Sequence, residues 1–416
     1  MKICFLTLGT RGDVQPYLAL AKELNRRGHQ SLIATGRSFE HLIEAENVAF
    51  YPTELDFMAL AQTPEGKAVL NAPLLHLQTA IKLSKEVLNP AYRKTMDDFY
   101  RAAQGAAMII YHPKALGAVD IAVKLGIPAI SMPSTPSTYP IADFPCLALT
   151  ARYNLGAWLN RKSYALNSKS EVAQIKQINA FRNETLHLPP RKAGAYTYFR
   201  GGEEIPIVYP ISPTLFKEVK DWNGHVYLPG FFFLETNEVL SRDLVTFLEE
   251  GARPLTVTFS SMQLKKPEIF MRKLLSALQE LNKRAVILLG NLQLDLPGND
   301  RIFVTKQAPH ALLFEKSYAV LHHGGVGTTA AALRAGIPQL IMPCALDQPF
   351  WAKRMYQIGC GLEPLSERIT KEDLISALKN IEEEKLVQQA QLIGQSIQSE
   401  RGIENAAEWL EAQFRG

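Results

Sequence analysis

A stretch of eight residues, His322 to Thr329, combines the side chains and the backbone freedom that a phosphate site needs. It contains three glycines, two histidines and two threonines: His322, His323, Gly324, Gly325, Gly327, Thr328 and Thr329. An apolar run precedes it and a helical pattern follows, which predicts a strand, a tight turn and the start of a helix. Backbone N–H groups at a helix N-terminus lack partners and favour an anion. The stretch therefore predicts a phosphate or diphosphate site; the alternative is a tight turn without a ligand.

A second polar turn lies near the start of the chain. The apolar run Ile3 to Leu8 predicts a strand, and a helical pattern begins at Val14. Between them, Asp13 is suited to two compatible roles, the N-cap of that helix or a base that accepts a proton from a hydroxyl. His112 directly follows another predicted strand, Met108 to Tyr111. Because parallel strands present ligands at their carboxyl ends, we expect Asp13 and His112 at the same sheet edge.

The elements that position these residues alternate between strands and helices in both halves of the chain. Apolar runs at 3–8, 31–34, 108–111 and 129–132 are followed in the second half by runs at 255–259, 285–289, 302–304, 319–321 and 339–342. Strands separated by helices predict an α/β protein with two Rossmann-like domains facing across a cleft. We expect an N-terminal domain over 1–215, a linker over 216–235 and a C-terminal domain over 236–416. The last helix is a candidate to pack back on the first domain.

Composition narrows the class of protein. The 416 residues are 47% hydrophobic and 21% charged, with a net charge of +4, which gives no case for a nucleic-acid partner. Four scattered cysteines favour reduced thiols in a cytoplasm over disulfides or a zinc site. The apolar run near the N-terminus is too short for a signal peptide or a membrane span. We therefore expect a cytoplasmic protein of two domains.

Four motifs in the correct order resemble a known family. Gly9 to Pro16 resembles the opening motif of bacterial and fungal family 1 glycosyltransferases, among them sterol glucosyltransferases, glycopeptide-antibiotic glycosyltransferases and rhamnosyltransferases. His322 to Thr329, then Gly336 to Pro338 and Asp347 to Trp351, resemble the donor-binding signature of the same family. The resemblance spans nearly the whole chain and implies the GT-B fold.

The resemblance also implies a reaction. It is the inverting transfer of a hexose from a UDP- or dTDP-sugar, with UDP favoured, to a hydroxyl of a small lipophilic acceptor such as a sterol, a lipid or a natural-product aglycone. The nucleotide sugar is a substrate, so no cofactor is expected, and neither is a metal. The alternative on the same fold is a sugar-nucleotide epimerase or hydrolase, which needs no acceptor pocket.

Site residues follow from the family's motifs position by position. The donor diphosphate is assigned to Ser261, His323, Gly325, Gly327 and Thr328, the donor sugar to Asp347 and Gln348, and the nucleotide base to Gln307 and Ala308. Without the resemblance, Asp347 and Gln348 could simply begin the next helix. Asp13 lies where plant relatives carry a catalytic histidine, and His112 lies near the position of the aspartate that orients it. Which of the two is the base stays open.

The acceptor side offers one physical signal. Residues 152–200 hold nine Lys or Arg and two acidic residues. Seven aromatic residues lie among them: Tyr153, Trp158, Tyr164, Phe181, Tyr196, Tyr198 and Phe199. Basic charge with interleaved aromatics suits a peripheral contact with the anionic inner face of a membrane. A solvated surface with the aromatics turned into the core explains the same composition, and both interpretations stay open.

Overall fold

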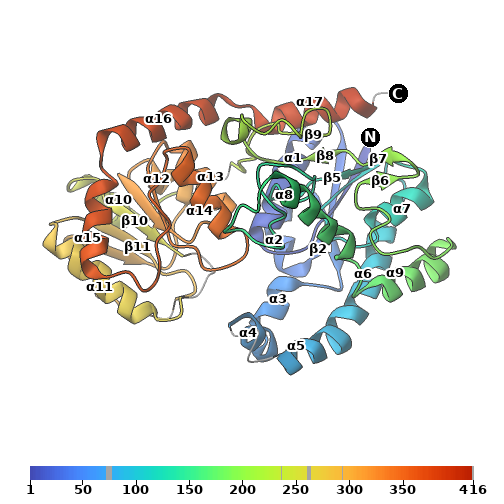
Figure 1. The fold of residues 1–416 in the computed structure, drawn as a ribbon, viewed down its shortest axis with the longest axis horizontal. Helices are drawn as coiled ribbons and strands as arrows, with labels where there is room; N and C mark the ends of the chain where they lie inside the picture. Colours follow the sequence, from blue (N-terminus) through green and yellow to red (C-terminus); the bar gives the residue numbers. More distant parts are fainter. Residues whose placement is uncertain (72–76, 236, 260–263, 293, 415–416) are drawn as a thin grey trace. The chain divides into compact units, whose positions relative to one another are not determined.

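The chain folds into two compact units (Figure 1). The computed structural model describes residues 1–71, 77–235, 237–259, 264–292 and 294–414. Unit 1 comprises Met1–Leu149, Asn154–Glu235 and Arg401–Gly416, and unit 2 comprises Thr150–Tyr153 and Thr236–Glu400. Each unit is built around its own parallel sheet, so the predicted α/β fold with two parallel-sheet domains is confirmed.

The sheet of unit 1 has seven strands in the order β3-β2-β1-β4-β5-β8-β9, with every pairing parallel. The strands are β1 (Lys2–Leu6), β2 (Gln30–Gly36), β3 (Ala49–Thr53), β4 (Met108–Tyr111), β5 (Ala129–Ser131), β8 (Ile207–Val208) and β9 (Val226–Tyr227). A separate hairpin pairs β6 (Phe199–Arg200) with β7 (Glu203–Glu204). The helices are α1 (Arg11–Arg26), α2 (Glu40–Glu44), α3 (Phe57–Gln62), α4 (Pro64–Asn71), α5 (Leu77–Leu83), α6 (Asn89–Ala102), α7 (Ala118–Leu125), α8 (Ala157–Ser163), α9 (Ile175–Phe181) and α17 (Gly402–Phe414).

Helices cover both faces of this sheet, as strands with no polar face require. Successive residues of β1 point to opposite faces. Ile3 and Phe5 join a core with α1 and α17, whereas Cys4 and Leu6 join a core with α6, α7 and α9. All four side chains are at most 1% exposed, so the edge that follows β1 is held by packing from both sides.

Unit 2 has a five-stranded parallel sheet in the order β12-β11-β10-β13-β14. The strands are β10 (Leu255–Thr258), β11 (Ala285–Leu288), β12 (Ile302–Thr305), β13 (Ala319–His322) and β14 (Gln339–Ile341). The helices are α10 (Arg242–Glu249), α11 (Pro267–Glu280), α12 (His310–Phe314), α13 (Val326–Arg334), α14 (Gln348–Gln357), α15 (Lys371–Asn380) and α16 (Glu384–Ser399). One core packs β10 against α11 and α15, and the other packs β11 and β13 against α10, α12 and α13.

The stretch 216–235, expected to be a linker, instead forms part of unit 1. Its β9 pairs with β8 in the sheet, and Trp222, Phe231 and Phe232 are buried. These apolar side chains account for the difference, because burying them stabilises the segment against the unit. The helix α17 also belongs to unit 1, where it packs on α1.

Candidate active site

Asp13 and His112 lie together at the carboxyl edge of the unit 1 sheet. Strands β1 and β4 are parallel neighbours, with Leu6 opposite Tyr111 in the register, so the turns that follow them emerge side by side. The Nε2 atom of His112 is 3.2 Å from Oδ1 of Asp13. Both residues are at least nine-tenths buried. The two residues that the sequence places at the same sheet edge are therefore in direct contact.

Asp13 is not the N-cap of its helix. The helix α1 begins at Arg11, three residues earlier than expected, and Thr10 occupies the cap position. The carboxylate instead accepts hydrogen bonds on Oδ2 from the Thr10 backbone N–H (2.8 Å) and the Thr10 hydroxyl (3.2 Å). The reason is local: a threonine followed three positions later by an acidic residue pairs the cap with the first turn.

His112 is held as a neutral hydrogen-bond donor. Its Nδ1 atom accepts from the backbone N–H of Lys114 at 3.1 Å, which leaves the proton on Nε2 directed at Asp13. Burial lowers the pKa of His112, an effect that the Asp13 carboxylate only partly opposes. Both ring nitrogens of His112 are therefore engaged within the protein, one with the Lys114 backbone and one with Asp13.

Lys114 is a member of this cluster that sequence reasoning missed. Its Nζ atom lies 2.9 Å from Oδ2 of Asp13, and 46% of its side chain is exposed. Burial alone raises the pKa of Asp13, but the hydrogen bonds from His112 and Thr10 and the charge of Lys114 outweigh it and hold that pKa well below its usual range. The available signal was position, because Lys114 follows His112 by two residues at the same edge.

Gly9 leaves the space that the Asp13 carboxylate occupies. Its φ angle is +141°, and a Cβ atom built there would lie 2.1 Å from Oδ2 of Asp13. Only glycine fits this position without displacing the carboxylate. The motif that begins at Gly9 therefore requires glycine there, because any side chain would displace the Asp13 carboxylate.

In unit 2, the two adjacent histidines have different roles. His322 is fully buried, its Nε2 atom is 2.9 Å from Oε1 of Gln339, and its Nδ1 atom accepts from the Gly324 backbone N–H. His323 is 7% exposed, and its Nδ1 atom has no hydrogen-bond partner among the described residues. Burial lowers the pKa of His322 to about 3 and that of His323 to about 4, so both are neutral at pH 7. His322 fixes the turn, whereas His323 hydrogen-bonds the Thr258 backbone through its other ring nitrogen and leaves Nδ1 without a partner among the described residues.

The helix α13 begins at Val326, within the stretch His322 to Thr329 rather than after it, and Gly325 occupies its N-cap position. Gly327 is exposed, and a Cβ atom there would meet nothing within 4 Å. Thr328 and Thr329 are buried in the first turn, and within the described part of the chain the Thr329 hydroxyl has no partner. An open helix N-terminus with unused polar groups suits an anion. Ser261, also assigned to the diphosphate, lies outside the described residues.

The two residues assigned to the donor sugar lie beside this turn. A Cβ atom on Gly324 would come within 3.2 Å of the Gln348 backbone oxygen, so the turn and the start of α14 are in close contact. Oε1 of Gln348 accepts from the backbone N–H groups of Cys344 and Ala345, which leaves its amide NH₂ as the group for a ligand. Oδ2 of Asp347 accepts from Nε1 of Trp351 at 2.7 Å. The helix-start role and the sugar-binding role are thus compatible.

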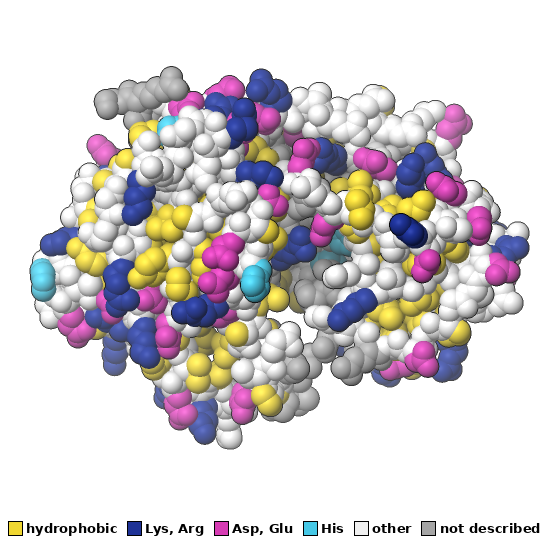
Figure 2. Space-filling model, turned by 180° about the vertical axis from the view of Figure 1, so that it is seen from behind, with side chains coloured by type: hydrophobic (Ala, Val, Ile, Leu, Met, Phe, Trp, Pro, Cys, Tyr) yellow, Lys and Arg dark blue, Asp and Glu magenta, His cyan; other side chains and the backbone are white. Residues whose placement is uncertain are grey.

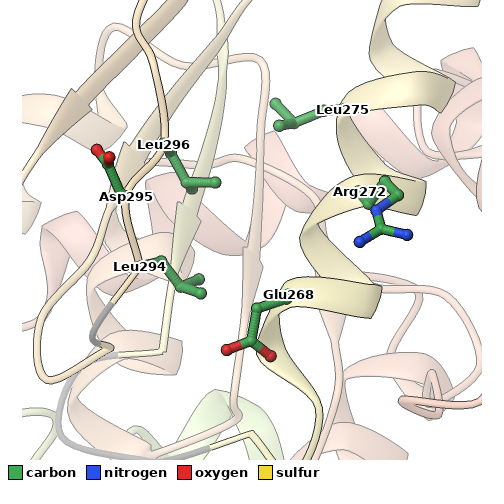
Figure 3. A pocket seen from close by; sticks show the side chains of 6 residues that line it. All are labelled: Glu268, Arg272, Leu275, Leu294, Asp295 and Leu296. Atoms are coloured by element: carbon green, nitrogen blue, oxygen red, sulfur yellow. The ribbon is translucent and has the colours of Figure 1, made fainter.

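The residues assigned to the nucleotide base precede α12. Gln307 is exposed and Ala308 half-buried in the loop between β12 and α12. Separately, a cavity of about 310 Å³ opens beside α11 (Figure 3). Its described lining is Glu268, Arg272, Leu275, Leu294, Asp295 and Leu296, and none of these was assigned to the site.

Much of the basic and aromatic stretch 152–200 is structural. Arg182 and Arg191 both pair with buried Asp120 and lie over the ring of Tyr196, and Phe181 is fully buried. Among the side chains that stay exposed are Tyr153, Phe199 and two of α8, where Trp158 is 69% and Leu159 49% exposed. On the face seen in Figure 2, basic and acidic side chains are interspersed, in keeping with the small net charge. Within the described residues, no helix is long and apolar enough to span a bilayer.

Comparisons with known proteins agree with this geometry. Residues 3–137 match the glycosyltransferase family 28 N-terminal domain, and residues 272–402 match the erythromycin biosynthesis protein CIII-like C-terminal domain. The chain is 31% identical to the sterol 3-beta-glucosyltransferase UGT80B1 of Arabidopsis thaliana, over 98% of this chain and 67% of that protein. It is 30% identical to the sterol 3-beta-glucosyltransferase of Pichia angusta, over 98% of this chain but 33% of that protein.

Solved structures show the same fold at lower identity. The glycosyltransferase of kitacinnamycin superposes with a TM-score of 0.74 at 16% identity, covering 99% of this chain and 98% of that one. The glycosyltransferase VinC in complex with dTDP superposes with a TM-score of 0.69 at 17% identity, covering both chains in full. With the motifs, the sheets and the relatives in agreement, the chain belongs to the family 1 glycosyltransferases of GT-B fold and is a glycosyltransferase of the sterol-glucosyltransferase type.

Proposed function

We propose that this enzyme transfers a hexose, with inversion, from a UDP- or dTDP-sugar to the hydroxyl of a lipophilic acceptor, and that the acceptor is a sterol. The observation that carries the proposal is the buried Asp13 carboxylate, which His112 orients from the neighbouring strand. The relatives are sterol 3-beta-glucosyltransferases, which supports glucose as the sugar and a sterol as the acceptor. UDP is the favoured nucleotide. Because the solved structure of VinC is a complex with dTDP, dTDP is tested as the alternative.

The proposed reaction is a single displacement. The acceptor oxygen forms a bond to the anomeric carbon as the bond from that carbon to the diphosphate oxygen breaks, and the electron pair leaves with the diphosphate. The hydroxyl proton passes to Asp13, while His112 keeps the carboxylate in place. His323 and the first turn of α13 stabilise the charge that develops on the diphosphate. Asp347 and the Gln348 amide hold sugar hydroxyls.

A carboxylate of low pKa is a weak base in the resting enzyme, and the partners of Asp13 explain how its basicity can rise. Oδ2 receives three donors, two from Thr10 and one from Lys114, and of these only Lys114 carries a charge. An acceptor that displaces Lys114 removes a cation from Asp13 and raises the pKa of that carboxyl. The base would thus strengthen when the acceptor is present.

We also propose that α8, rather than the whole stretch 152–200, contacts an anionic membrane surface. Trp158 and Leu159 are exposed there, and Nζ of Lys162 lies 6.0 Å from the Trp158 ring centroid. The test is sedimentation with vesicles of phosphatidylcholine and phosphatidylserine. Trp158→Ala should lower the bound fraction about threefold or more relative to Phe199→Ala, an exposed aromatic in the β6–β7 hairpin. Equal binding of the two variants would remove α8 from the proposal.

The activity itself is tested with purified protein, UDP-glucose or dTDP-glucose, and a sterol in detergent, in the presence of EDTA. We expect a sterol glucoside whose anomeric configuration, read by NMR, is opposite to that of the donor. Product of the same configuration would contradict the single displacement. Loss of turnover in EDTA with recovery on adding Mg²⁺ would show that the predicted metal independence is wrong.

A further inference from the structure

Leu346 directly precedes Asp347 and Gln348, the two residues assigned to the donor sugar. Both its backbone conformation and its exposure to solvent are unfavourable for a leucine. Its φ angle is +56°, and 82% of it is exposed. The other described non-glycine residues with positive φ are Asn47, His187 and Asn282, residue types that tolerate this conformation. Leucine does not, and an exposed leucine gains no burial to offset the strain. Strain of this kind is commonly retained at ligand sites.

The loop around Leu346 is held in place from both sides. Before it, Cys344 and Ala345 donate their backbone N–H groups to Oε1 of Gln348. After it, Asp347 accepts from the Trp351 indole and begins α14. These contacts impose the left-handed conformation and keep the leucine side chain directed outward. The same contacts fix the two residues assigned to the donor sugar.

We propose that Leu346 is a specificity-determining residue that contacts the apolar body of the acceptor, an inference that rests on the proposed function. The reacting hydroxyl must approach the anomeric carbon to about 3–3.5 Å, so the acceptor body lies next to the sugar. Asp347 and Gln348 bind the hexose hydroxyls. The isobutyl side chain of Leu346 has no polar atom, so it suits contact with an apolar surface. A sterol or similar lipid provides one.

The experiment compares Leu346→Gly with matched variants. Glycine relieves the strained φ and removes the apolar contact, so we expect Tm to rise by roughly 2–4 °C while KM for a sterol acceptor rises about tenfold. KM for the nucleotide sugar should stay within about twofold. Leu346→Met, which keeps an apolar side chain, should retain the acceptor KM.

Two controls separate the backbone from the side chain. Asn282→Gly replaces a residue with a similar φ of +55° after the end of α11; because asparagine already tolerates this conformation, Tm and both KM values should change little. Leu392→Ala removes an exposed leucine from α16 and should leave the kinetics unchanged.

The outcomes separate this inference from the proposed function. An unchanged sterol KM in Leu346→Gly, with normal turnover, would overturn the inference alone, and a rise only in the donor KM would do the same. Absence of transfer by the unmodified enzyme to any acceptor would overturn the proposed function. Calorimetric titration of the sterol in the presence of UDP gives a binding measurement that does not depend on turnover. There, equal affinity of the unmodified enzyme and Leu346→Gly would also overturn the inference.

Discussion

The polar clusters at the two sheet edges differ in how far the protein itself satisfies them. At the unit 1 edge, Asp13 has contacts with His112, Thr10 and Lys114, so its carboxylate is charged and held in one orientation. At the unit 2 edge, the Nδ1 atom of His323 and the Thr329 hydroxyl lack partners among the described residues. One edge is complete without a ligand, and the other is incomplete.

This difference matches the two tasks. A base must be oriented before the acceptor arrives, and its partners do that. A site for a departing diphosphate must offer donors that are not already used, because donors occupied by the protein cannot stabilise new charge. Buried polar groups without partners are costly, so their presence in unit 2 points to a ligand.

The largest effect is expected from Asp13→Asn. The amide keeps the shape and the bond from Thr10 but cannot accept the proton, so kcat should fall by about 10²- to 10⁴-fold. Donor binding in unit 2 should be unchanged in a thermal-shift titration with UDP. Turnover close to that of the unmodified enzyme would show that Asp13 is not the base. The proposed difference in task between the two sheet edges would then fail.

A pair of glycine variants sharpens the comparison. Gly9→Ala places a methyl group on the Asp13 carboxylate and should cost at least about 2 kcal/mol of folding stability, with loss of activity. Gly327→Ala meets no protein atom within 4 Å and should leave Tm unchanged or slightly raised. Its methyl group faces the expected anion, so UDP affinity should fall. Thermal unfolding with and without UDP measures both; an unaffected UDP affinity in Gly327→Ala would argue against the anion site.

The adjacent histidines give the next largest contrast. His322→Ala leaves Oε1 of Gln339 buried without its donor and opens a cavity, so it should cost about 2–4 kcal/mol of stability. His323→Ala breaks no bond of Nδ1 to the described residues and loses one hydrogen bond to the Thr258 backbone, so Tm should fall less than in His322→Ala, but UDP affinity should drop about tenfold. Equal losses of stability in the two variants would mean that His323 is structural.

The smallest effect is expected from Lys114→Met. The ion pair with Asp13 is half-exposed, so its loss should cost at most about 1 kcal/mol at pH 7. Since the folded-state pKa of Asp13 is depressed, this stability is present above the unfolded-state pKa and is lost as the pH falls through the folded-state pKa. Urea unfolding should therefore show a difference between the two proteins that persists from pH 7 through the unfolded-state pKa of the carboxyl and closes only at still lower pH, where Asp13 is protonated in the folded state. In an Asp13→Asn background the substitution should have no effect, and a persistent difference there would assign the effect to something other than the ion pair.

The sequence predicts the alternating strands and helices of the fold, but it does not predict the short or irregular segments. Apolar runs separated by helical patterns located β1, β4, β10, β11 and β13 to within one or two residues. The strands β8 and β9 have two residues each and therefore show no periodicity. For this reason the sequence indicates a linker over 216–235, although Trp222 and Phe231 are buried in unit 1. Composition over 152–200 could not distinguish inward-facing arginines such as Arg182 from exposed ones.

The site shows the same limit. The edge rule for parallel strands was enough to bring Asp13 to His112, because it depends only on where strands end. Long-range pairing of individual side chains has no local signal, so the contact of Lys114 with Asp13 was missed. The left-handed conformation of Leu346 was equally hidden, since it is imposed by Gln348 and Asp347 rather than by leucine itself.

The most direct test of the account is a thermal-shift panel with UDP, dTDP and GDP, each alone and as its glucose conjugate, in EDTA. If the turn from His322 to Gly325 and the start of α13 form a nucleotide-diphosphate site, ligand at a hundredfold its Kd should stabilise the protein by about 2.7 kcal/mol. We expect this shift with UDP or dTDP, its loss in His323→Ala, and none with GDP. No shift with any nucleotide would contradict the assignment of the donor site to this turn.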